Sequence, residues 1–144
     1  DARIAQVDAF SMNYDEACAF FGTPDPDAIL AGLKRYGKPC FFRLGERGSA
    51  LVTPSKSVFA PAIGLSESVD PTGCGNCSTA ASLVGLAEGL SLKKTVLMAN
   101  MAASYCARQT RPWPLANDAF RMQMRQRLDE LMISTPFICD KIPL

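Results

Sequence analysis

A glycine-containing loop that leads directly into a helix constrains this chain more than any other feature. It lies between Val69 and Gly89, where Val-Asp-Pro-Thr-Gly-Cys-Gly-Asn is followed by Cys-Ser-Thr-Ala-Ala-Ser-Leu-Val-Gly-Leu-Ala-Glu-Gly. Gly73 and Gly75 allow the backbone to turn without the steric cost of a Cβ atom, and Gly89 suits a helix end. Four residues at helical spacing predict one buried apolar face: Ala80, Leu83, Val84 and Ala87.

The start of such a helix attracts anions. Its first N–H groups have no partner inside the helix, and the positive end of the helix dipole points at the same place. A phosphate group held there would accept hydrogen bonds from the backbone. We therefore predict a phosphate cradle at Gly73–Gly75.

Charge and length narrow the classes of protein that fit. The chain has 144 residues, about one domain, and a formal net charge of +1 with no long block of one sign. This balance argues against a nucleic-acid partner. No apolar run approaches the roughly 20 residues that cross a bilayer, and the first residues show no signal pattern. We expect a cytoplasmic protein without a membrane partner, and the sequence at Asp1 is typical of the middle of a protein.

The sequence contains no histidine and has six cysteines scattered among apolar residues. The absence of histidine excludes Ser/His and Cys/His nucleophiles and every His-based metal site. The cysteine pattern favours reduced thiols over a secreted disulfide framework.

The first 60 residues are predicted to alternate short strands with helices. Asn13 and Glu16 have the spacing of a capping box for a helix that ends near Gly22. Gly45 and Gly48 read as turn residues between strands, and Arg43 as a solvated strand end or a phosphate ligand. The apolar patterns and turn residues in this part of the chain predict strands at 4–10, 39–43, 49–53 and 57–60 and a helix at 26–36.

After the glycine loop the pattern is helical. Ser91 can cap a helix from Leu92 to about Arg108, in which Asn100 either bonds a neighbouring backbone or faces a ligand. Thr110–Pro114 breaks the pattern, and a charged helix follows at 117–132 with Phe120, Met124, Leu128 and Leu131 as its apolar stripe. The sequence of the tail at 134–144 indicates neither a helix nor a strand.

Cys74 and Cys77 form a Cys-x-x-Cys motif at a helix start, where redox motifs occur. A zinc site would need two more ligands, and the sequence offers neither a second such motif nor a histidine. Dithiol redox chemistry stays open as the third functional hypothesis.

Several of these motifs together resemble the ribokinase-like sugar kinases, the PfkB carbohydrate kinase family. Val69–Asn76 resembles that family's Asp-Thr-x-Gly-Ala-Gly-Asp signature, and Asn13-Tyr-Asp-Glu16 its Asn-x-x-Glu motif. Arg43-Leu-Gly-Glu-Arg-Gly48 is similar to its Lys/Thr-x-Gly-x-x-Gly segment, and Ala99-Asn-Met-Ala-Ala to the continuation of its last helices. The resemblance covers roughly residues 1–111 and corresponds to the carboxy-terminal half of a family member.

The resemblance implies an ATP-dependent phosphoryl transfer to a hydroxyl of a sugar or sugar-like alcohol. Gly73, Cys74 and Gly75 would form an anion hole whose backbone N–H groups stabilise charge on the transferring group. Glu16, with Asn13, would position Mg²⁺ and the phosphates through water.

The resemblance also assigns the remaining nucleotide contacts. Arg43, Gly45 and Gly48 would lie beside the nucleotide, and Asn100 near the adenine.

Asn76 departs from the family signature, which has an aspartate there as the general base. An amide has no comparable basicity and cannot take the proton of the attacking hydroxyl. The leading function is therefore a PfkB-type sugar kinase in which Asn76 impairs turnover. The alternative is a non-catalytic, kinase-like protein that binds nucleotide or sugar phosphate.

The expected fold is the carboxy-terminal half of a ribokinase-like, three-layer α/β/α fold. Residues 1–144 would form its nucleotide-binding half, with helices flanking a largely parallel sheet and hairpins at one edge. The resemblance implies that the sugar-binding half and its lid lie outside this sequence. An apolar surface left without that half would favour a homo-oligomer or association with it.

Overall fold

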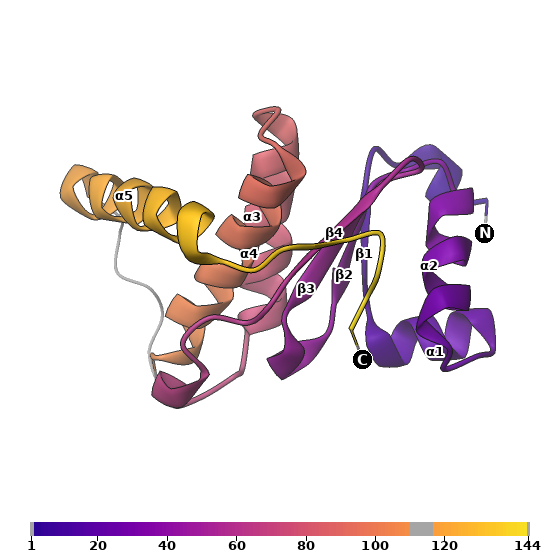
Figure 1. Cartoon of the computed structure of the whole chain (residues 1–144), viewed down its shortest axis with the longest axis horizontal. Coiled ribbons are helices and arrows are strands. Elements are labelled where there is room, and N and C mark those ends of the chain that lie inside the picture. The colour runs from indigo at the N-terminus through magenta and orange to yellow at the C-terminus, as the bar shows by residue number, and fades with distance from the viewer. Residues whose placement is uncertain (1, 110–116, 144) are drawn as a thin grey trace.

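The computed structural model describes residues 2–109 and 117–143; the predicted break at Thr110–Pro114 lies outside these ranges. Figure 1 shows three layers, with a five-stranded sheet between one pair of helices, α1 and α2, and a second pair, α3 and α4. The helix α5 lies outside α4. The elements in chain order are η1 (Ile4–Gln6), β1 (Phe10–Asn13), α1 (Tyr14–Phe21), α2 (Pro26–Arg35), β2 (Cys40–Arg43), η2 (Gly45–Arg47), β3 (Ser49–Val52), β4 (Ser57–Ala60), η3 (Leu65–Glu67), α3 (Cys74–Ala87), α4 (Leu92–Ala107), α5 (Asp118–Ser134) and β5 (Ile138–Cys139).

The sheet order is β1-β2-β3-β4-β5. Only β1 and β2 run parallel, joined by the crossover through α1 and α2, so the prediction of a largely parallel sheet is wrong. The other pairs are antiparallel because short connections join β2 to β3 and β3 to β4, and a connection of a few residues can only reverse the chain. The predicted hairpins are confirmed.

The first predicted strand is also wrong in place. Residues 4–6 form the short 3₁₀ helix η1, and extended structure begins only at Phe10. Phe10 pairs with Cys40 and its backbone N–H donates to Pro39. The apolar residues before it have no neighbouring strand within the described chain, and an unpaired strand is not stable alone.

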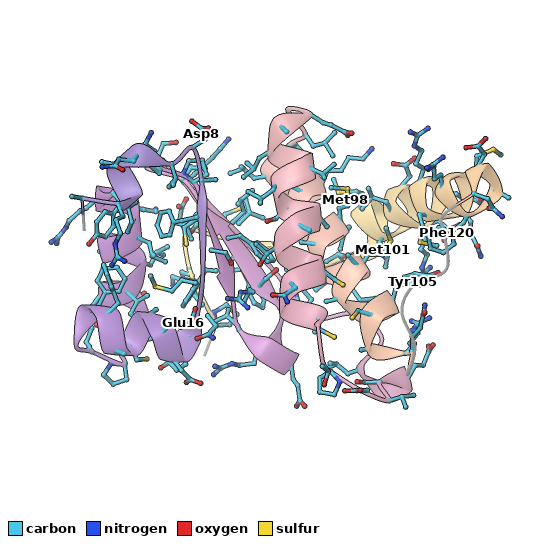
Figure 2. All side chains as sticks on the ribbon, turned by 180° about the vertical axis from the view of Figure 1, so that it is seen from behind. Asp8, Glu16, Met98, Met101, Tyr105 and Phe120 are labelled. Carbon is cyan, nitrogen blue, oxygen red and sulfur yellow. The ribbon has the colours of Figure 1, made fainter. Side chains whose placement is uncertain are left out.

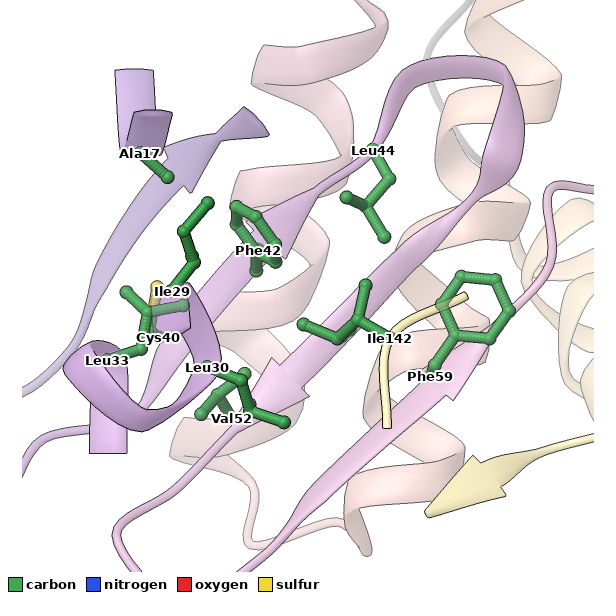
Figure 3. Close-up of a cluster of buried hydrophobic side chains, with 11 residues drawn as sticks. Ala17, Ile29, Leu30, Leu33, Cys40, Phe42, Leu44, Val52, Phe59 and Ile142 are labelled. Carbon is green, nitrogen blue, oxygen red and sulfur yellow. The ribbon is translucent and has the colours of Figure 1, made fainter. Parts of the chain in front are cut away.

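The core between α1, α2 and the sheet is apolar and closely packed. Ile29 and Leu33 of α2 and Phe42 of β2 are fully buried there (Figure 3). Pro26 in the first turn and the Asp25 side chain, which accepts from two backbone N–H groups, fix the start of α2. This layer holds the carboxyl ends of β1 and β2 in place.

On the other face of the sheet, α3 packs on α4 through small residues. Ser78, Ser82 and Gly85 are the buried residues of α3, and a Cβ on Gly85 would meet Thr95 at 2.9 Å. The predicted buried face is therefore wrong. Leu83 and Val84 are 47% and 51% exposed, and Ala80 and Ala87 are exposed with them. Close approach of two backbones at small side chains determines the buried face here, because the helix is apolar on more than one side.

The tail, for which the sequence predicts nothing, closes the far edge of the sheet. β5 pairs with β4, and the Asp140 carboxylate accepts from Lys34 Nζ at 2.8 Å and from the Ser57 N–H at 3.0 Å. Ile142 is buried in the core under α2 (Figure 3).

The helix α5 packs against α4 through its predicted apolar stripe. Leu128 and Leu131 are buried, and the Tyr105 and Phe120 rings meet edge to face with centroids 5.7 Å apart (Figure 2). In the described ranges, no helix is long and apolar enough to cross a membrane.

Candidate functional site

A cavity of about 520 Å³ lies where β2 ends and β3 begins, against the start of α3 and the last turns of α4. Its volume falls within the range of about 300–1,000 Å³ typical of small-molecule sites. Of the residues proposed from sequence, the cavity is lined by Asn13, Arg43, Gly45, Gly48, Cys74, Gly75 and Asn100. The fold thus brings together residues from four separate motifs.

The loop before α3 is shaped by its own hydrogen bonds. Gly73 adopts a left-handed conformation (φ 86°) as the residue before the helix, and its carbonyl accepts from the Cys77 N–H. The Asp70 carboxylate accepts from Thr72, and the backbone and side-chain hydrogen bonds from Thr72 lower the pKa of Asp70. Asp70 therefore stabilises the loop entrance, while the first-turn N–H groups of α3 point out of the helix end.

The Arg43 guanidinium lies over this helix start. A Cβ on Gly75 would come within 2.5 Å of Arg43 Nη1, so the two can be adjacent only because Gly75 has no side chain. Arg43 Nε donates to Ser11 Oγ at 3.1 Å, which in turn lies 3.2 Å from Thr79 Oγ1 of α3. Of the two sequence interpretations of Arg43, a solvated strand end does not fit this partly buried cation, and its role as a phosphate ligand stays a prediction.

Glu16 performs the capping role predicted for it. Asn13 Oδ1 accepts from the Glu16 N–H at 2.7 Å, and Glu16 Oε2 accepts from the Asn13 N–H at 2.7 Å. The same carboxylate oxygen lies 3.4 Å from Arg43 Nη2. Figure 2 shows Glu16 at the start of α1, beside the ends of the strands. The capping box thus holds one carboxylate next to the cation at the anion site.

Asn100 is held by protein atoms. It is 6% exposed, its Nδ2 donates to the carbonyls of Ala60 and Pro61 at 3.0 and 2.9 Å, and its Oδ1 accepts from Ser49 Oγ at 2.5 Å. Of the two alternatives raised from sequence, the amide bonds neighbouring groups, and it reaches the cavity as part of the wall. It positions the chain after β4, which forms one side of the cavity.

Gly45 and Gly48 form the turn between β2 and β3. Both have positive φ, and the Leu44 N–H donates to the Gly48 carbonyl at 2.9 Å. A Cβ on Gly48 would collide with the carbonyl oxygen of Ala60. Gly48 therefore allows the turn to lie directly against the strand end that Asn100 fixes.

Asn76 lies apart from the cavity. It is exposed, and its spacing places it on the same face of α3 as Ala80 and Leu83. Gly75 and Ser78 of the same turns line the cavity. The position that the resemblance assigns to the general base and the residues that it assigns to the nucleotide thus occupy different sides of one helix end.

The Cys-x-x-Cys motif lacks the acidic thiol of a redox enzyme. Burial, followed by the neighbouring Cys106 thiol, raises the pKa of Cys74 to about 11, and the same causes raise the pKa of Cys77. Both are therefore protonated at neutral pH, which disfavours a dithiol oxidoreductase. Across the described ranges, no group of three or more His, Cys, Asp or Glu side chains could hold a metal ion.

Sequence reasoning missed several contributors to the site. Ser11 and Thr79 support Arg43, and Ser104 with Arg108 lies against Gly64. Ser11, Arg43 and Thr79 are far apart in the chain, as Gly64 is from Ser104 and Arg108, so no local spacing rule predicts these contacts. A signal does exist at Gly64, because a glycine between two apolar residues after a strand indicates a turn with positive φ.

Comparison with known proteins identifies the family. The profile of the pfkB family carbohydrate kinases matches residues 1–113. The chain belongs to the pfkB carbohydrate kinase family. The fold of this pfkB-family chain is similar to that of an adenosine kinase from Sinorhizobium meliloti, at 34% sequence identity and a TM-score of 0.73, over 84% of this chain and 36% of that one.

Two ribokinases have the same fold. A ribokinase of Arabidopsis thaliana, solved with ribose and ATP, matches at 29% identity and a TM-score of 0.72, over 87% of this chain and 42% of its own. A ribokinase from Thermotoga maritima matches at 21% identity and a TM-score of 0.67, over 88% of this chain and 43% of that one. The chain thus spans less than half the length of these structures. No curated protein matches it significantly.

Proposed function

We propose that this pfkB-family chain provides the nucleotide side of an ATP-dependent kinase that phosphorylates a hydroxyl of a sugar or sugar-like alcohol. The observation that carries the proposal is the cavity that ends at the start of α3, with the Arg43 cation over Gly75. A cavity of this volume suits a nucleotide, and a helix start beside a cation suits its terminal phosphate. The ribokinase solved with ATP supports the same ligand class.

In this proposal, backbone N–H groups at Gly73–Gly75 stabilise negative charge as the phosphoryl group leaves ATP. Arg43 adds a fixed positive charge at the same place, held by Ser11 and Glu16. A phosphate that enters would compete with Glu16 for the guanidinium, since Arg43 Nη2 and Glu16 Oε2 are 3.4 Å apart and the side chains of Arg43 and Glu16 are 25% and 55% exposed.

Glu16 is the residue proposed to hold Mg²⁺, through water, together with Asn13. A carboxylate oxygen is a ligand that Mg²⁺ accepts, and the ion usually keeps several waters beside one or two carboxylates. Mg²⁺ would neutralise charge on the phosphates when bound. The capping box keeps the Glu16 carboxylate oriented whether or not the ion is present.

The exposed face of α3 is proposed to meet the acceptor side of the enzyme. Asn76, Ala80 and Leu83 lie on it, and nothing in the described chain covers them. We propose that residues 1–144 are the nucleotide-binding half of the kinase domain and that the sugar-binding half or a second copy packs there. A kinase of this type uses ATP, so a cytoplasmic location is part of the proposal.

The alternative is a kinase-like protein that binds nucleotide or sugar phosphate without turnover. Asn76 favours it, because the cavity and its cation remain while the general base is missing.

Titration of the full-length protein with ATP and Mg²⁺, followed by a sugar-dependent ADP-release assay, tests both. Saturable ATP binding with ADP release on one member of a broad sugar and nucleoside panel supports the kinase. Binding without release on the whole panel supports the alternative. No binding of ATP overturns both, and an Arg43→Met variant serves as the matched low-affinity control.

A further inference from the structure

We propose that Cys74, Cys77 and Cys106 form an oxidation-sensitive thiol cluster, in which Cys106 forms a disulfide with one of the two α3 cysteines when a low-molecular-weight disulfide oxidant is present. The cluster joins the anion-hole loop to the last turn of α4. Neither the family profile nor the kinase chemistry requires it, and the site takes a thiol-reactive oxidant as its ligand class.

The contacts of the cluster come from both helices. Cys74 Sγ lies 3.4 Å from the Ala103 carbonyl of α4, and Cys106 Sγ lies 3.5 Å from the Thr72 carbonyl in the loop. A Cβ on Gly73 would be 3.5 Å from Cys106 Sγ, so this thiol rests directly on the loop backbone. Cys106 therefore lies against the loop that leads into Cys74, and Cys77 closes the first turn of α3 by donating its N–H to Gly73.

The three thiols are reduced and partly exposed, which a modification site requires. The contacts of Cys74 and Cys106 place both thiols between the first turn of α3 and the last turns of α4. In keeping with these contacts, burial and, after it, the Cys106 thiol raise the pKa of Cys74 and of Cys77. Cys40, by contrast, is buried in the core, and Cys139 is exposed on β5 at the opposite end of the sheet order from β1. The cluster is thus the part of the described chain where thiols converge.

The reaction needs two exchanges. Because the α3 thiols are protonated at neutral pH, the oxidation is run at alkaline pH, where a cluster thiol loses its proton. The resulting thiolate attacks one sulfur of the oxidant disulfide, forms a mixed disulfide and releases the other half of the oxidant as a thiolate that takes up a proton. The second cluster thiolate then attacks the protein sulfur of that bond, forms the protein disulfide and releases the second oxidant thiol. The protein loses two electrons and two protons, and both appear on the two released thiols, so the oxidant is fully reduced.

The bond would act on the candidate anion hole. Cys74 lines the cavity next to Gly75, and Cys77 closes the first turn by donating its N–H to Gly73. A disulfide from either residue to Cys106 would tie this turn to α4 and move the backbone N–H groups that we propose to hold phosphate. Oxidation would therefore lower nucleotide affinity reversibly.

Trypsin makes the test unambiguous, because it places Cys74 and Cys77 in one peptide, residues 57–93, and Cys106 in another, residues 95–108. The full-length protein is treated with oxidised glutathione, alkylated and digested without reduction. We expect one linked pair of these two peptides. The pair should be absent in Cys106→Ser and present in the matched control Cys139→Ser.

Mapping and binding are measured separately. A disulfide confined to residues 57–93, mixed disulfides alone, or a link that survives Cys106→Ser would overturn the proposal. If Cys106→Ser fails to fold by circular dichroism, Cys106→Ala replaces it. Loss of ATP affinity on oxidation, with recovery on adding dithiothreitol, extends the proposal to function, and the peptide map stands even if the protein binds no ATP.

Discussion

Arg43 and Gly75 occupy adjoining space: a Cβ on Gly75 would lie 2.5 Å from Arg43 Nη1, although the two residues belong to different layers of the fold. The glycine thus does two things, since it also stands in the first turn of α3. It leaves room for the Arg43 guanidinium beside the proposed anion site. Replacing Gly75 by alanine adds one methyl group there and so tests whether that cation contributes to binding.

Gly75→Ala should leave stability almost unchanged and weaken nucleotide binding. Alanine favours a helix over glycine by about 0.5–1 kcal/mol, while the methyl group displaces the mobile end of Arg43. Loss of one hydrogen bond to a charged group costs about 1.5–3 kcal/mol, so the Kd for ATP should rise about 10- to 150-fold. Urea unfolding and ATP titration measure the two effects.

A double-mutant cycle with Arg43→Met isolates the cause. If the methyl group acts through Arg43, the double variant should bind ATP no more weakly than Arg43→Met alone. Additive losses would mean that Gly75→Ala disturbs the backbone N–H groups instead.

Asn76→Asp should raise the rate of phosphoryl transfer if the missing carboxylate limits turnover. A positioned general base contributes about 10²- to 10⁴-fold. ADP release under saturating substrates measures the rate, and Asn76→Ala is the control that should stay at the starting level. An unchanged rate in Asn76→Asp would show that the acceptor hydroxyl is activated in another way.

Gly48→Ala should destabilise the protein far more than Gly45→Ala. Both glycines have positive φ, 117° and 61°, but a Cβ on Gly45 meets nothing within 4 Å while one on Gly48 meets the backbone of Ala60. We expect a loss of about 1–2 kcal/mol for Gly45→Ala and about 3 kcal/mol or more for Gly48→Ala. Urea unfolding compares them, and equal losses would contradict the close approach of the turn to β4.

Asn100→Ala should lower the free energy of unfolding, with any effect on nucleotide binding following from that loss of stability. The change leaves the Ser49 hydroxyl and the carbonyls of Ala60 and Pro61 without their buried partner, at a cost of about 2–4 kcal/mol. Asn76→Ala, on the exposed face of α3, should change the free energy of unfolding by no more than about 0.5 kcal/mol. A stable Asn100→Ala protein with altered base preference would instead favour a direct adenine contact.

Low pH should remove the contribution of the Asp140 carboxylate to the free energy of unfolding. The hydrogen bond from Lys34, and then the one from the Ser57 N–H, lower the pKa of Asp140 below its ordinary value of 3.8. Stability from a lowered carboxyl pKa is present above pH 3.8 and is lost as the pH falls through the folded-state pKa.

The matched variant is Asp140→Asn, which tolerates the left-handed backbone at this position (φ 55°). Wild type should be the more stable protein at about pH 7, and the difference should shrink as the pH falls below 3.8 and through the lowered pKa of Asp140. A difference that persists at low pH would assign the effect to packing of the tail.

Local signals in the sequence were sufficient for most elements and for the cap at Asn13. They gave the start of α2 at the Asp25-Pro26 junction and the stripe of α5 because each depends on residues a few positions apart. The buried face of α3 was wrong because it depends on how closely α4 approaches Gly85, which no spacing within α3 records.

The site follows the same division. The loop at Gly73–Gly75 could be proposed from its glycines alone, and the family resemblance added Glu16 and Arg43. The relation of Arg43 to Gly75 could not be proposed, and for Asn100 the sequence left open whether the amide bonds a neighbouring backbone or faces a ligand, since both depend on contacts between distant segments. The sequence also did not predict that Asp140 lies at the sheet edge or that Ile142 joins the core, because a two-residue strand is too short to show a periodic pattern.

The first turn of α3 divides two environments, with Gly75 facing the cavity and Asn76 facing the uncovered side. A donor in the cavity and an acceptor beside Asn76 would approach one phosphorus atom from opposite directions. In the proposed kinase, such a path is a direct displacement that inverts the arrangement of the three remaining oxygens around phosphorus. We therefore expect inversion of configuration at a chiral thiophosphate, whichever alcohol the proposed kinase phosphorylates.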